Sequence, residues 1–109
     1  MRANYTAKAT LIGLPPGVLG VKPKPEGRTD GLMRLSDVTL HWSAKSEKAY
    51  EKMQLISSTA CRMMLSGKVQ MIVIGRKRYY CYIVEVTPSA EFHRAHLAVR
   101  VRLSGRTKI

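Results

Sequence analysis

The sequence predicts an α+β protein in which an antiparallel β-sheet or sandwich packs on one amphipathic helix. Segments that alternate apolar and polar residues recur along the chain, and one segment of helical spacing lies among them. A stretch rich in proline and glycine, residues 13–31, predicts a long loop or arm. With 109 residues, we expect a single domain spanning 1–109.

The N-terminal part begins with a weak strand signal. Residues 2–12 carry apolar or aromatic side chains at every second position, which fits an edge or arm strand. Residues 13–31 then hold four prolines and five glycines, a density that no regular element tolerates. We therefore expect no strand or helix in that segment.

A loop of this length is uncommon inside a small domain. It is a binding loop, a disordered linker, or an arm that a neighbouring chain orders. The prolines of the stretch 22–25 favour an extended backbone, and its lysines are positively charged. Such a stretch is suited to lie along an acidic groove or a phosphate backbone. The contact candidates here are Lys22, Lys24 and Arg28, and a solvated loop is the alternative.

The next segment, 33–42, has the pattern of a half-buried strand. Val38, Leu40 and Trp42 alternate with polar neighbours, so these three are expected in the core. A helix follows over 46–66, where Ser43 or Ser46 offers the N-cap oxygen.

The helix has further terminal signals and one apolar face. Glu47 lies in its first turn, where the helix dipole favours an anion, and Gly67 suits the left-handed C-terminal cap. The apolar positions are Ala49, Met53, Ile56, Ala60 and Met63. Methionines at helical spacing usually fill a core, so we do not assign them to a metal.

A hairpin follows the helix. The β-branched run 69–74 is typical of a strand buried on both faces, and Gly75-Arg76-Lys77 supplies the turn. The return strand, 78–87, is expected to end at Pro88. Its alternation places Tyr80, Tyr82, Val84 and Val86 on one face and Tyr79, Cys81, Ile83 and Glu85 on the other.

The last predicted strand, 97–103, has the clearest alternation. Apolar residues at 97, 99, 101 and 103 alternate with a face that includes Arg100 and Arg102. The last three strands should therefore form a meander. The expected core residues are Val38, Leu40, Trp42, Met53, Ile56, Val99 and Val101.

The sequence favours no enzyme class. The three histidines and seven carboxylates have no spacing typical of a catalytic group or a metal site, and no phosphate-binding glycine motif is present. Cys61 and Cys81 are expected to be buried thiols, because neither lies at metal-ligand spacing. We expect no catalytic residue, no metal and no cofactor. No apolar run reaches the length of a membrane span, so we expect no membrane insertion.

Charge is the least ordinary feature. The 19 Lys and Arg exceed the 7 Asp and Glu, for a formal net charge of +12. One interpretation is an anionic partner such as nucleic acid, with Arg76, Lys77, Arg78, Arg100 and Arg102 on phosphates and Tyr79, Tyr80 or Tyr82 stacking on bases. The other is a solvated surface or a basic rim within an assembly, since tyrosine favours strands and edge arginines oppose aggregation.

The order of segments supplies a resemblance. Asp37-Val38-Thr39-Leu40-His41-Trp42 leads to Ser46-Glu47-Lys48-Ala49, then Ser66-Gly67-Lys68-Val69, Arg78-Tyr79-Tyr80-Cys81-Tyr82 and the strand Ala98 to Leu103. This pattern resembles the N-terminal domain of distal tail and baseplate proteins of long-tailed phages. The resemblance implies a non-enzymatic ring subunit that forms homo-oligomers, contacts other structural subunits, and belongs to a virion assembled in the bacterial cytoplasm. In it, the 13–31 arm and the basic strand face contact neighbours. The alternative is a basic nucleic-acid-binding accessory protein.

Overall fold

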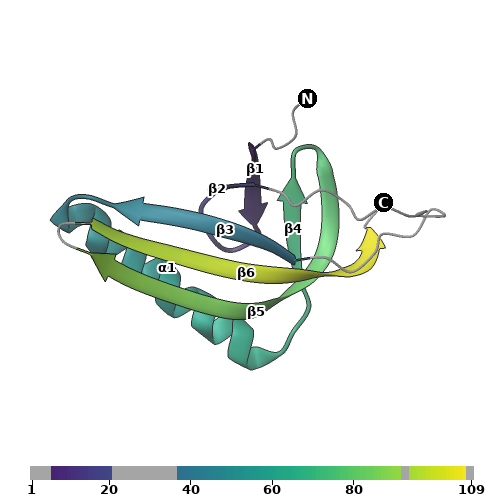
Figure 1. The fold of residues 1–109 in the computed structure, drawn as a ribbon. Helices are drawn as coiled ribbons and strands as arrows, with labels where there is room; N and C mark the ends of the chain where they lie inside the picture. The colour runs from purple at the N-terminus through teal and green to yellow at the C-terminus, as the bar shows by residue number, and fades with distance from the viewer. Residues whose placement is uncertain (1–5, 21–36, 92–93, 108–109) are drawn as a thin grey trace.

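The computed structural model describes residues 6–20, 37–91 and 94–107 (Figure 1). These residues form one helix and six strands, which confirms the predicted α+β class. Their bounds are β1 Thr6–Leu11, β2 Gly17–Gly20, β3 Asp37–Ala44, α1 Glu47–Ser66, β4 Gln70–Ile74, β5 Lys77–Glu91 and β6 Arg94–Thr107.

The strands close into an antiparallel barrel in the order β1-β2-β3-β6-β5-β4. The predicted meander is confirmed, because β4 pairs with β5 and β5 pairs with β6. Two pairings in the barrel join strands that are far apart in sequence. β3 pairs with β6 over eight residues, and β1 pairs with β4. The alternation of apolar and polar residues within one strand does not indicate which distant strand pairs with it.

Helix α1 begins and ends at the predicted caps. The Ser46 hydroxyl accepts a hydrogen bond from the Ala49 amide at 3.2 Å, and Gly67 adopts the left-handed conformation at φ 69°. Met53, Ile56 and Ala60 are the buried residues of the helix, which packs on β5, β3 and β6. Figure 1 shows α1 along these three long strands, whereas β1 and β4 lie beyond it.

The core follows the alternation of β6. Leu97, Val99 and Val101 are fully buried, and they face Trp42, Leu40 and Val38 across the β3–β6 ladder. The expected core residues Val38, Leu40, Met53, Ile56, Val99 and Val101 are all buried. Trp42 is only half-buried and packs against the edge of this cluster.

One expectation for 13–31 is wrong, because β2 lies inside that segment. Gly17 is buried against β3, where a Cβ atom would stand 3.1 Å from Leu40 Cβ. Gly17 thus does not interrupt the strand, but lets two strand backbones approach closely. Residues 21–31 lie outside the described part, as do 33–36 at the start of the predicted 33–42 strand. The described strands β1 and β3 begin at Thr6 and Asp37.

The predicted course of the return strand also needs correction. β5 does not end at Pro88 but continues to Glu91, and Pro88 pairs with Leu97 of β6. β4 pairs with β5 only as far as Cys81, so beyond it no described strand pairs with the other side of β5. Proline, which lacks an N–H group, is tolerated on such an unpaired edge.

An irregularity in β5 changes which side chains face inward. The β5–β6 register shifts between Ile83 and Glu85, which leaves Val84 as the extra residue of a bulge. Glu85 therefore faces outward beside Arg100, and Val86 packs against the core, the reverse of the predicted alternation. The expectation that 69–74 is buried on both faces is also wrong, because only Ile72 is fully buried there.

Candidate functional site

The predicted anion-contact residues separate into groups in the structure. Lys22, Lys24 and Arg28 lie outside the described residues. Arg76, Lys77 and Arg78 gather at the β4–β5 turn, and Arg100 and Arg102 lie on β6. The two described groups have different electrostatic surroundings.

Arg100 and Arg102 belong to an ion-pair cluster. Arg102 donates two hydrogen bonds to the Asp37 carboxylate, from Nε at 2.8 Å and from Nη2 at 3.2 Å. Arg100 donates to Asp37 at 3.3 Å and reaches Glu85 at 3.0 Å. The hydrogen bonds to Asp37 raise the pKa of Arg102 above its ordinary value. These ion pairs link β6 to β3 and to β5, and they offset part of the charge of the two arginines.

The cations at the β4–β5 turn have no such partners among the residues that the structure describes. Gly75 turns the chain in the left-handed conformation at φ 64°, and the side chains of Arg76, Lys77 and Arg78 are exposed. Among the described residues, none of these three forms an ion pair. No described carboxylate therefore neutralises their charge.

Lys8 also lies at this turn, although the sequence did not predict it as an anion-contact residue. The Gly75 amide donates a hydrogen bond to the Lys8 carbonyl at 3.3 Å, which brings β1 alongside the turn. The Lys8 side chain is exposed and has no described ion pair either. Only the β1–β4 pairing reveals this proximity, because positions 8 and 75 are far apart in the sequence. We call Lys8, Arg76, Lys77 and Arg78 the turn cluster.

Two of the three candidate tyrosines extend from the turn cluster along β5. Cys81 and Ile83 are buried, and Tyr79 packs against the core, so these residues face inward. Arg78, Tyr80 and Tyr82 occupy the intervening outward positions, and Tyr82 is 37% exposed. Tyr79 and Tyr80 are both half-buried, but Tyr79 packs against the core, so Tyr80 and Tyr82 are the better stacking candidates.

Three exposed apolar side chains lie near the other end of β4, where α1 ends and β1 ends. Leu65 is 81% exposed at the end of α1, Val69 is 62% exposed before β4, and Ile12 is 53% exposed after β1. The Ile12 amide donates to the Met71 carbonyl at 2.9 Å, two residues beyond Val69, so these segments are adjacent. We call Ile12, Leu65 and Val69 the apolar end.

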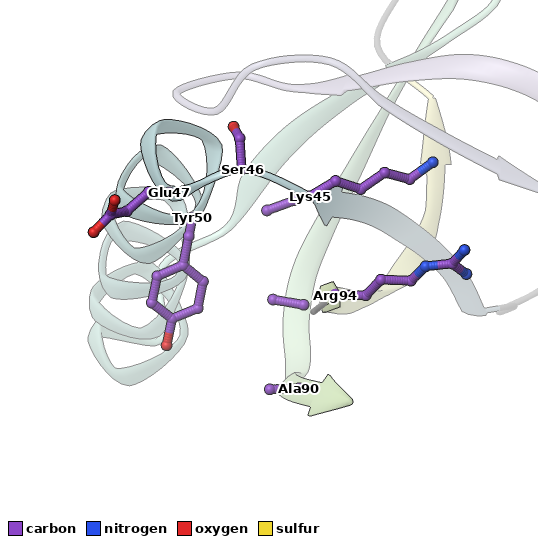
Figure 2. A pocket seen from close by; sticks show the side chains of 8 residues that line it. Lys45, Ser46, Glu47, Tyr50, Ala90 and Arg94 are labelled. Carbon is purple, nitrogen blue, oxygen red and sulfur yellow. The ribbon is translucent and has the colours of Figure 1, made fainter. Parts of the chain in front are cut away.

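A separate pocket of about 350 Å³ lies where α1 begins (Figure 2). Figure 2 shows Glu47 and Tyr50 extending from the helix, while Lys45 and Arg94 extend away from it. These charged groups diverge, so the pocket does not bring an acid and a base together over one point. Its lining residues are Ala44, Lys45, Ser46, Glu47, Tyr50, Ala90, Arg94 and Ala95.

We next consider metal sites and membrane-spanning helices among the described residues. No group of three or more metal-ligating side chains occurs among residues 6–20, 37–91 and 94–107. No helix of the described residues is long and apolar enough to cross a membrane. Comparison with protein-family models, curated proteins and solved structures finds no match to this chain.

Proposed function

We propose that this chain is a non-enzymatic structural assembly protein, a subunit of a phage tail or baseplate ring. In this proposal it forms homo-oligomers, contacts other structural subunits of the virion, and assembles in the bacterial cytoplasm. The observation that carries the proposal is the apolar end, where three large side chains on adjacent segments remain in water.

The physical argument rests on their grouping. Isolated exposed apolar residues are common on soluble proteins and need no partner. Leu65 and Val69 instead lie on either side of Gly67, the C-cap of α1. Ile12 lies on a segment next to them, because its amide donates to the Met71 carbonyl. Covering such a side chain contributes on the order of 1 to 2 kcal/mol, so several at once can hold a neighbouring subunit.

The main alternative is a nucleic-acid-binding accessory protein that uses all five C-terminal cations. The ion pairs of Arg100 and Arg102 with Asp37 and Glu85 weaken this alternative, because they occupy two of the five proposed phosphate contacts. Apolar side chains such as Leu65 also gain nothing from phosphates. Assembly through protein contacts therefore accounts for more of the exposed surface.

The test is the mass of the purified chain by multi-angle light scattering at 0.15 and 0.5 M salt. We expect a discrete oligomer that persists at 0.5 M salt, because apolar contacts do not weaken with screening. The double variant Leu65→Ser with Val69→Ser should dissociate it while the far-UV circular dichroism spectrum stays that of the wild type, since both side chains are exposed.

The matched control is Leu55→Ser, which removes another exposed leucine, 69% exposed, from the middle of α1. We expect this variant to keep the oligomer. A wild-type chain that remains monomeric across the concentration range, or a Leu65/Val69 variant that assembles normally, would contradict the proposal.

A further inference from the structure

The turn cluster gathers four cations that form no ion pair with any other described residue. Every described acidic residue lies elsewhere: Asp37 and Glu85 contact Arg100, Glu47 and Glu51 lie on α1, and Glu91 lies at the far end of β5. The four cations of the cluster therefore produce a positive potential that no described carboxylate offsets. Such a surface attracts a chain of phosphates.

Tyrosines beside these cations add a second element of recognition. Tyr80 and Tyr82 follow Arg78 at every second position on the outer face of the barrel. Their rings can stack on bases while the cluster contacts the phosphates. Tyr82 lies opposite Arg102 in the β5–β6 ladder, but Asp37 already engages that guanidinium, so we do not count it as a contact.

The spacing of the tyrosines favours a single strand over a duplex. Alternate residues of a strand lie about 6.6 Å apart, whereas stacked bases in a duplex lie about 3.4 Å apart. Bases that stack on both rings must therefore be separated from each other. A flexible single strand allows this separation, but a duplex holds its bases paired and inside the helix.

We propose that this face binds single-stranded nucleic acid, with the turn cluster on the phosphates and Tyr80 and Tyr82 on the bases. This proposal is independent of the assembly role, because it uses none of the apolar end. A protein subunit with an acidic surface is the competing occupant. The two outward tyrosines beside these cations favour the nucleic acid, since stacking gives each ring a partner in any sequence.

The test uses fluorescence anisotropy with a labelled dT12 oligonucleotide from 50 to 500 mM salt. Each phosphate contact contributes about −0.7 to the slope of log K, the binding constant, against log salt concentration. Four contacts therefore predict a slope of about −2.8. Affinity should then fall roughly 600-fold over this range. A 12-base-pair duplex should bind at least tenfold more weakly than dT12, because it cannot stack on the tyrosines.

Matched variants separate a local site from the overall charge. Arg76→Gln with Lys77→Gln should reduce the slope by about 1.4, the share of two contacts. Lys48→Gln with Lys52→Gln removes the same charge from the exposed side of α1 and should leave the slope unchanged. Equal slopes in the two double variants would overturn the proposal.

A second pair of variants tests stacking. Tyr80→Leu and Tyr82→Leu should each weaken dT12 binding about fivefold or more, the lower end of the effect of removing a stacking ring. Tyr50→Leu is the control, because Tyr50 is 43% exposed on α1 and lies outside this face. Equal effects of all three substitutions, no binding of dT12 at 50 mM salt, or tighter binding of the duplex would each refute the proposal. Binding of an acidic protein at this face with no binding of dT12 would favour the competing occupant.

Discussion

The substitution Gly17→Ala distinguishes the observed β2 strand from a loop by the sign of its effect. In a loop with ordinary backbone angles, alanine in place of glycine stabilises a protein by about 0.4 to 1 kcal/mol, because it restricts the unfolded chain. In the structure, Gly17 is buried against β3, and the new methyl group would meet a neighbouring strand.

The magnitude follows from the distances around this site. The added Cβ would lie 3.1 Å from Leu40 Cβ and 3.5 Å from the His41 amide nitrogen. Leu40 is fully buried, and its Cβ is fixed to the backbone, so a rotation of its side chain cannot relieve the contact. Overpacking of this kind costs about 1 to 3 kcal/mol, which exceeds the gain from the unfolded state. We expect a net loss of roughly 1 to 2 kcal/mol.

The assay is urea unfolding of both proteins, followed by circular dichroism at one protein concentration. The Gly17→Ala midpoint should fall while the slope of the transition stays constant, because the same surface is exposed on unfolding. In a thermal scan, a loss of 1 kcal/mol corresponds to about 4 to 8 °C for a domain near this size. An unchanged or higher midpoint would refute the close packing of β2 on β3.

Two further predictions concern titration and the ion-pair cluster. Burial raises the pKa of the Cys81 thiol to about 12 from an ordinary 9.0, so the buried neutral thiol contributes stability that is complete below pH 9 and is lost as the pH rises towards 12. The stability advantage of wild type over Cys81→Ala should therefore shrink above pH 9, and a constant difference in the unfolding free energy would contradict this. Asp37→Asn should lower Tm and steepen the salt dependence of dT12 binding, because it releases Arg100 and Arg102 to contact phosphates. If neither the Tm of the protein nor the salt dependence of dT12 binding changes, Asp37 does not neutralise these arginines.

Local signals in the sequence were sufficient for the helix and for the last strand. Ser46 and Gly67 mark the ends of α1 because a hydroxyl cap and a left-handed glycine act within a few residues of the chain. The alternation from 97 to 103 defines the buried face of β6 for a similar reason. Features that depend on distant partners were not predicted. Pro88 is compatible with β5 only because β4 stops pairing at Cys81, and the bulge at Val84 leaves no recognisable local signal.

The candidate sites were predicted in part for the same reason. The turn cations and tyrosines follow from the predicted hairpin and the strand after it, and strand alternation separates outward Tyr80 and Tyr82 from inward Tyr79. The contribution of Lys8 depends on the pairing of β1 with β4, which alternation does not reveal. The neutralisation of Arg100 and Arg102 depends on the pairing of β3 with β6 and on the bulge that turns Glu85 outward. The apolar end could not be recognised, because Val69 was expected in a strand buried on both faces.

The mass of the 109-residue chain at 0.5 M salt, measured by multi-angle light scattering, tests the assembly role most directly. We predict a discrete oligomer whose mass is the same at 0.15 and 0.5 M salt, and which dissociates when Leu65 and Val69 are replaced together by serine. A monomer at both salt concentrations would contradict the assembly role and leave the exposed apolar end without a subunit to cover it.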